Sequence, residues 1–137
     1  MAGRDWNTRK RLLAGNMFLL AALFLLVTFN KEYLRPAAGR GTLAELLTGC
    51  LPNFLAAFLI SMAGINGILF RKPVHGRAYA IIFSAAVFII LSFEEFIPIW
   101  GASKVFDSFD IAASAVGSIL AVAVYELVRR RMLHPSK

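Results

Sequence analysis

The sequence contains a single cysteine, Cys50, and two histidines. One thiol excludes an intramolecular disulfide and any Cys-based metal cluster. His75 stands in a short polar segment with no second His or carboxylate beside it, which favours a solvated residue over a metal ligand. No nucleophile triad and no phosphate-binding motif is present either. The sequence therefore does not favour an enzyme, and we expect no cofactor.

Charged residues are also scarce, at 17% of the 137 residues, whereas hydrophobic residues make up 58%. Soluble domains contain about 25% charged residues, and a soluble core could not bury so much apolar surface. The net charge of +7 would suit nucleic-acid binding. The basic residues, however, flank long apolar runs, where they can meet anionic lipid head groups. The composition thus predicts an integral membrane protein with the lipid bilayer as its partner, and no nucleic acid.

A membrane-crossing helix needs about 20 mostly apolar residues. Four stretches reach or approach this length, and they are residues 12–29, 51–70, 78–93 and 109–128. The third is the shortest, so we expect Arg77 and Glu94 at head-group level or a locally thinned bilayer. The sequence therefore predicts an all-α, four-helix transmembrane bundle that forms a single domain over residues 1–137.

Basic residues indicate the orientation of this bundle. Eleven of the fifteen Lys and Arg residues lie in the two tails and in residues 71–77, which share one side of a four-span protein. The positive-inside rule places that side, with both termini, in the cytoplasm. The first apolar run has 18 residues, longer than the roughly 7 to 15 of a signal-peptide core, which favours a retained span over a cleaved signal. Short loops and the absence of organelle-targeting signals suit a bacterial inner membrane.

The first connection, residues 30–49, mixes charges with Gly and Pro and predicts an exposed connector. Within it, Thr42 and Glu45 form a capping-box pattern, which indicates a short interfacial helix over residues 42–47. Residues 71–77 predict a tight hairpin between antiparallel helices.

Polar and small residues predict where helices meet. Asn53 and Asn66 interrupt the second span, and amides in hydrocarbon need hydrogen-bond partners, so we expect both to face other helices. A ligand path is the alternative. In the fourth span Ala113, Gly117 and Ala121 recur every four residues, a ridge that allows close helix approach. Either an internal neighbour or a second copy of the chain could occupy it.

Acidic residues concentrate in one place. Four of the eight acids, Glu94, Glu95, Asp107 and Asp110, lie between the third and fourth spans. The apolar residues 96–100 between them predict a partly buried, re-entrant or interfacial hairpin. Three roles are open for this group: capping of the fourth helix, binding of a divalent cation or cationic head group, and, least favoured, acid/base catalysis.

The stretch from Leu91 to Gly117 resembles the C-terminal signature of VanZ-like membrane proteins. Pro98, Asp110 and Gly117 match that pattern, whereas Ser114 stands in place of its Asn, Glu94 in place of its Gln and Leu91 in place of its Glu, and the loop Arg is missing. The resemblance implies a bacterial inner-membrane protein related to glycopeptide (teicoplanin) resistance and cell-envelope function.

Two hypotheses of different classes follow. The first is an envelope protein that binds a head group or cation on the outer side through the four acids. The second is a small transporter or accessory subunit whose fourth helix packs on a membrane partner or on a second copy. Replacing Asp110 should abolish function under the first hypothesis, and widening Gly117 should do so under the second.

Overall fold

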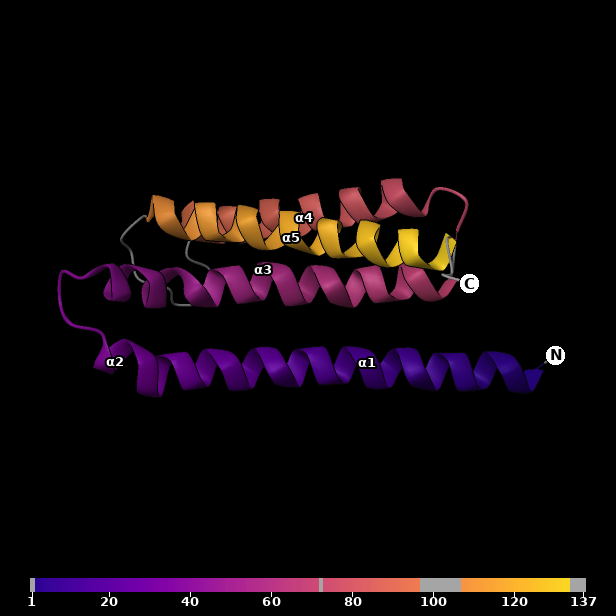
Figure 1. Cartoon of the computed structure of the whole chain (residues 1–137), viewed down its shortest axis with the longest axis horizontal. Helices are drawn as coiled ribbons and strands as arrows, with labels where there is room; N and C mark the ends of the chain where they lie inside the picture. The colour runs from indigo at the N-terminus through magenta and orange to yellow at the C-terminus, as the bar shows by residue number, and fades with distance from the viewer. Residues whose placement is uncertain (1, 72, 97–106, 134–137) are drawn as a thin grey trace.

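The computed structural model describes residues 2–71, 73–96 and 107–133 and forms an all-α bundle (Figure 1). Its elements are α1 (Ala2–Phe29), the π-helix η1 (Asn30–Leu34), α2 (Arg35–Ala37), α3 (Leu43–Arg71), α4 (Gly76–Phe96) and α5 (Ser108–Leu133). The four long helices lie side by side, with the start of α1 and the end of α5 at the same end. This arrangement confirms the predicted fold class.

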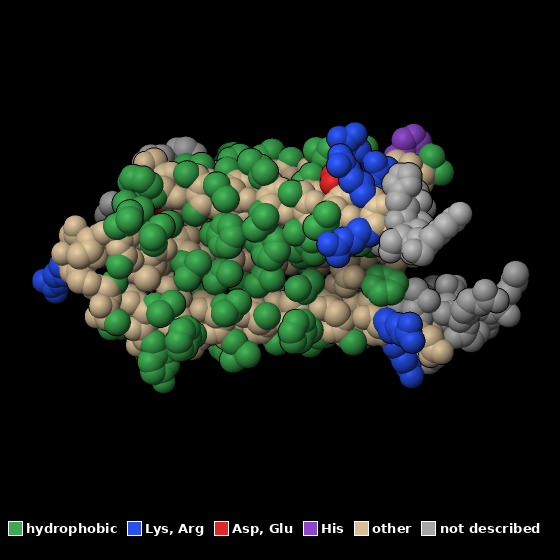
Figure 2. Space-filling model, viewed as in Figure 1, with side chains coloured by type: hydrophobic (Ala, Val, Ile, Leu, Met, Phe, Trp, Pro, Cys, Tyr) green, Lys and Arg blue, Asp and Glu red, His purple; other side chains and the backbone are tan. Residues whose placement is uncertain are grey.

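Four stretches of helix are long and apolar enough to cross a membrane, and they are Lys10–Ala37, Leu43–Arg71, Gly76–Glu95 and Ser108–Arg131. Apolar side chains cover the middle of the face shown in Figure 2, and Lys and Arg gather toward its two ends. The third span is longer than the sequence suggested, because α4 includes the charged residues at both of its ends. Its 21 residues extend about 31 Å, enough for a bilayer core of ordinary thickness.

The first connection differs from the prediction. Most of residues 30–49 are exposed, as predicted, but an irregular connector was wrong, because the chain stays helical through η1 and α2 and leaves only a short turn before α3. The separate helix expected at residues 42–47 is instead the first part of α3. Its start is capped as the sequence indicated: Glu45 N–H donates to Thr42 Oγ1 at 3.2 Å, and the Glu45 carboxylate accepts from the N–H of Gly41.

Helix α3 contains Pro52, which has no N–H and leaves the carbonyl of Thr48, four residues earlier, without its helical partner. The side chain of Asn30 supplies that partner, since its Nδ2 donates to Thr48 O at 2.8 Å. Asn30 is 1% exposed and is the first residue of η1. The N–H of Arg35 donates to Asn30 O, the i+5 bond of a π-turn. The π-turn therefore begins at Asn30, the same residue whose side chain donates to Thr48 O on α3.

Helix α3 is the centre of the bundle and contacts α1, α4 and α5. Among the described elements, α1 contacts only α3 and η1. The core of the three-helix part consists of Ile65 on α3, Ala80 on α4, and Ala121 and Tyr125 on α5. The most apolar stretch of α1 contains no buried residue. Helix α1 therefore flanks a three-helix bundle on one side (Figure 1).

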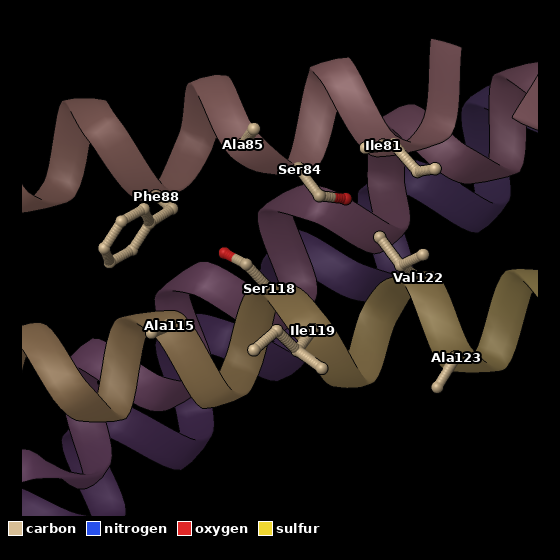
Figure 3. A pocket seen from close by; sticks show the side chains of 9 residues that line it. All are labelled: Ile81, Ser84, Ala85, Phe88, Ala115, Ser118, Ile119, Val122 and Ala123. Atoms are coloured by element: carbon tan, nitrogen blue, oxygen red, sulfur yellow. The ribbon is translucent and has the colours of Figure 1, made fainter. Parts of the chain in front are cut away.

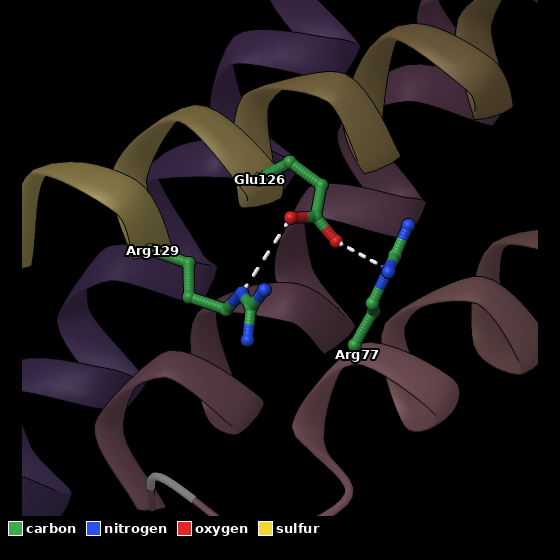
Figure 4. A network of polar contacts seen from close by, with 3 residues as sticks. All are labelled: Arg77, Glu126 and Arg129. Atoms are coloured by element: carbon green, nitrogen blue, oxygen red, sulfur yellow. Dashed lines mark ion pairs between the residues drawn. The ribbon is translucent and has the colours of Figure 1, made fainter. Parts of the chain in front are cut away.

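The end of the bundle that holds the α3–α4 turn carries an ion-pair network (Figure 4). Glu126 on α5 lies 2.8 Å from Arg77 Nε on α4 and 3.5 Å from Arg129 Nε on its own helix. Because Arg77 is 65% exposed, this pair contributes little to stability by itself. It links the start of α4 to the last turns of α5 at the basic end.

Candidate functional site

The opposite end of the bundle brings charged and polar residues together from four elements. Asp110 on α5 interacts electrostatically with Asp107 and with Arg35 on α2, and its carboxylate also interacts with the side chain of Asn53 on α3. Glu95 at the end of α4 lies within electrostatic range of Asp110, Asp107 and Glu94. We call Arg35, Asn53, Glu94, Glu95, Asp107 and Asp110 the polar cluster.

Asp107 acts as the N-cap of α5. Its Oδ1 accepts from the N–H of Phe109 at 2.9 Å, and its carbonyl accepts from the N–H of Asp110 at 3.2 Å. Two of the free N–H groups at the helix start are satisfied in this way. Its backbone N–H also interacts with the Glu95 carboxylate. Asp107 therefore holds α5 and α4 together at this end, which is the capping role that the sequence left open.

Asp110 is placed differently. It lies in the first turn of α5, is partly buried, and its Oδ1 is buried without a hydrogen-bond partner among the described residues. Buried acceptors are almost always paired, and a carboxylate oxygen without a donor is costly to keep. A ligand that donates a hydrogen bond at this position would satisfy it. Within the described part of the chain, Oδ1 of Asp110 is therefore an acceptor that a ligand could use.

Arg35 was missed as a site residue. The sequence placed it in an exposed connector, whereas the helical continuation through η1 brings its charge to Asp110. The available signal was the run from Lys31 to Leu34, which contains no Gly or Pro and can continue the preceding helix. The cluster thus contains a cation as well as four carboxylates.

The cluster does not resemble a metal centre. No group of three or more His, Cys, Asp and Glu residues in the described ranges is arranged to hold a metal ion. His75 lies exposed in the turn between α3 and α4, at the opposite end of the bundle from the cluster. The re-entrant or interfacial hairpin predicted between the third and fourth spans falls on residues 97–106, which lie outside the described part of the chain.

The small-residue ridge of α5 faces α3. A Cβ atom on Gly117 would lie 2.5 Å from the carbonyl oxygen of Phe54 and 3.0 Å from Ala57 Cβ. Ala121 is 0% exposed, and Ala113 is partly buried on the same ridge. An internal neighbour therefore occupies the ridge, which leaves it unable to receive a partner helix at Gly117.

The two asparagines of α3 contact different helices. Asn66 Nδ2 donates to Asn16 Oδ1 on α1 at 3.0 Å, next to Gly15, where a Cβ atom would lie 2.9 Å from the Asn66 amide. Asn53 belongs to the polar cluster and also lines a groove of about 410 Å³ between α1 and α3, together with Thr28 and apolar side chains. Asn66 therefore attaches α1, whereas Asn53 lies between the cluster and a lipid-facing groove.

A second groove, of about 500 Å³, lies between α4 and α5 (Figure 3). Small side chains on both helices hollow it, and Ile119 and Phe88 form part of its walls. Ser84 and Ser118 lie at its floor, 2% and 5% exposed, and neither hydroxyl has a hydrogen-bond partner in the described part of the structure. In a bilayer, hydrocarbon chains would cover this groove, and they offer the hydroxyls no acceptor.

Fold and composition define the class: a candidate multi-pass membrane protein with four spans and a partly buried polar cluster at one end. The chain matches no protein-family model, no curated protein and no solved structure with which it was compared.

Proposed function

We propose that this chain is a bacterial inner-membrane protein, with both termini in the cytoplasm, that binds a zwitterionic lipid head group in the polar cluster at the outer end of its bundle. The distribution of Lys and Arg supports this orientation, because the two tails and the α3–α4 turn hold eleven of the fifteen. The polar cluster then lies at the outer head-group level.

The buried Oδ1 of Asp110, which has no hydrogen-bond partner among the described residues, is the observation that carries the proposal. An ammonium group has three N–H donors and a positive charge, so it can satisfy this oxygen and offset the neighbouring carboxylate of Glu95. Arg35, whose charge also acts on Asp110, can pair with the phosphate of the same head group. A head group that combines an ammonium and a phosphate complements both charges of the cluster.

A head group suits these residues better than a divalent cation. Hard cations take six or more oxygen ligands in the case of Ca²⁺, or a near-ideal octahedron in the case of Mg²⁺. Asp107 already uses its Oδ1 to cap α5, and no three of the described acidic, His or Cys residues are arranged to hold a metal ion. An ammonium group needs only a few acceptors and no fixed coordination polyhedron, so the cluster suits it better than a metal ion.

The resemblance of residues 91–117 to VanZ-like proteins supports the same site from the sequence side. Asp110 and Gly117 fall on positions of that pattern, and the family is associated with the cell envelope and glycopeptide resistance. We propose an envelope role on this basis. The departures at Leu91, Glu94 and Ser114 indicate that this chain would perform it with a different set of polar residues.

Lipid selectivity tests the proposal. The purified protein in detergent is incubated with equal amounts of phosphatidylethanolamine and phosphatidylglycerol that carry the same chains, and native mass spectrometry measures how much of each lipid is retained. We expect the wild-type protein to prefer phosphatidylethanolamine and Asp110→Asn to lose the preference. Glu32→Gln is the matched control, since Glu32 is exposed at the same end and lies outside the cluster.

Equal retention of both lipids by the wild-type protein would overturn the proposal. So would an unchanged preference in Asp110→Asn. Free phosphoethanolamine added as a competitor should displace the lipid if the head group alone is recognised, and failure to compete would show that the chains dominate binding.

A further inference from the structure

The bond between Asn30 and Thr48 joins the two segments that supply the non-acidic residues of the polar cluster. Asn30 lies five residues before Arg35, and Thr48 lies five residues before Asn53. Arg35 and Asn53 both act on Asp110, and Asp110 in turn acts on Cys50 in the same part of α3. One side chain therefore connects both segments at a point within two helical turns of the cluster.

Pro52 makes this bond necessary. Between Thr48 and Pro52 the helix lacks one hydrogen bond, and a proline within a helix permits a bend at that place. In hydrocarbon, no water is present to replace the missing donor of this partly buried carbonyl. The Asn30 amide fills that place at 2.8 Å, so it opposes bending of the outer part of α3 away from η1.

The burial of Asn30 is consistent with this role, because a residue that only filled space here would not need a polar side chain. The side chain is 1% exposed, and its Oδ1 has no hydrogen-bond partner among the described residues. Leucine has a similar size and would avoid the buried, unpaired oxygen. What leucine would not provide is the donor to Thr48 O.

We infer that Asn30 is a positioning residue for the polar cluster: by bonding the carbonyl that Pro52 frees, it holds Arg35 and the outer part of α3 in place around Asp110. The inference rests on the proposed function for the identity of the ligand. The statement that the Asn30–Thr48 bond positions Arg35 and α3 does not depend on that function. Asn30 itself contacts no ligand in this scheme and acts only through Thr48 and η1.

Two variants isolate the bond. Asn30→Leu removes the donor. Pro52→Ala, added to it, introduces a backbone N–H that can bond Thr48 O in the ordinary helical manner and so makes the Asn30 donor unnecessary. A loss in the first variant that the second reverses is specific to this carbonyl, because a general packing defect at position 30 would not be repaired from position 52.

Cys50 provides a readout that needs no ligand, because it is the sole cysteine of the chain and lies partly buried beside the cluster. The rate at which a maleimide labels Cys50 in the folded, detergent-solubilised protein reports how closely the outer part of α3 packs. We expect Asn30→Leu to raise this rate several-fold and the Asn30→Leu/Pro52→Ala double variant to return it to the wild-type rate. Phosphatidylethanolamine preference should fall and recover in parallel.

The two readouts separate the two ideas. An unchanged labelling rate in Asn30→Leu, or an increase that Pro52→Ala does not reverse, would overturn the positioning role whatever the lipid result. A wild-type protein without lipid preference, in which the labelling rate still rises and recovers, would overturn the proposed function and support the positioning role. If Asn30→Leu does not fold, recovery of folded protein in the double variant supports the inference, and failure to recover overturns it.

Discussion

Gly117 of α5 lies directly against the backbone of α3, where a Cβ atom would be 2.5 Å from the Phe54 carbonyl oxygen and 3.1 Å from the Phe58 nitrogen. The neighbours at this contact are backbone atoms, which cannot move aside as a flexible side chain could. The packing of α5 on α3 at this place thus depends on the absence of a side chain at one position.

Gly117→Ala should therefore destabilise the protein, by about 1–3 kcal/mol, as expected for overpacking in a tight interface. Gly67→Ala on α3 is the matched control, because nothing lies within 4 Å of a Cβ atom there. Alanine favours helix over glycine by up to about 1 kcal/mol, so the control should be neutral or stabilising. Thermal unfolding in detergent measures both variants, and equal stability of the two would contradict the close contact.

Replacement of Asp107 and replacement of Asp110 should have different effects on stability and on lipid preference. Asp107→Ala removes the cap of α5 and should cost about 1 kcal/mol, whereas Asp107→Asn keeps an N-cap acceptor and should cost much less. Asp110→Asn removes a carboxylate with an unpaired oxygen and should not lower stability, although it abolishes lipid preference. Thermal unfolding and the lipid-retention assay on the same samples test this division of roles. Loss of stability in Asp110→Asn would instead make Asp110 a structural residue.

Part of the site could be predicted from the sequence, and part could not. The four acids stand out by composition, and the small-residue ridge indicates close packing of the fourth helix. The ridge does not say which helix it meets, because small residues allow any helix to approach. Arg35 was assigned to a loop because charges at the end of an apolar run are typical of a connector, yet a helix can extend charged residues into the head-group region.

The bond of Asn30 to Thr48 illustrates the same limit. Pro52 within an apolar run already implies that the carbonyl of Thr48 lacks its helical donor. Which residue supplies the donor depends on the packing of α1 against α3 and on the π-turn that directs Asn30 inward. These are tertiary features, and residues 18 positions apart carry no local pattern that would reveal them.

Replacing the buried hydroxyls of Ser84 and Ser118 should not lower the free energy of unfolding, in contrast to Gly117→Ala. Both are buried without a partner among the described residues, so Ser84→Ala and Ser118→Ala each remove an unsatisfied polar atom. We expect unfolding free energies that are unchanged or raised by up to about 1 kcal/mol. A fall of similar size in either variant would mean that its hydroxyl rotates to bond a helix carbonyl, as serines in membrane helices can.

Membrane orientation underlies the proposed function and can be tested with two exposed turns. Val74, 96% exposed in the turn between α3 and α4, and Arg40, exposed in the turn before α3, lie at opposite ends of the bundle. In a Cys50→Ser background, Arg40→Cys should react with a membrane-impermeant maleimide in intact cells, and Val74→Cys should react only after the cells are permeabilised. Both should react equally in detergent, which controls for thiol reactivity. Labelling of Val74→Cys alone in intact cells would place the polar cluster in the cytoplasm, and a ligand from the outer leaflet could not then reach Asp110.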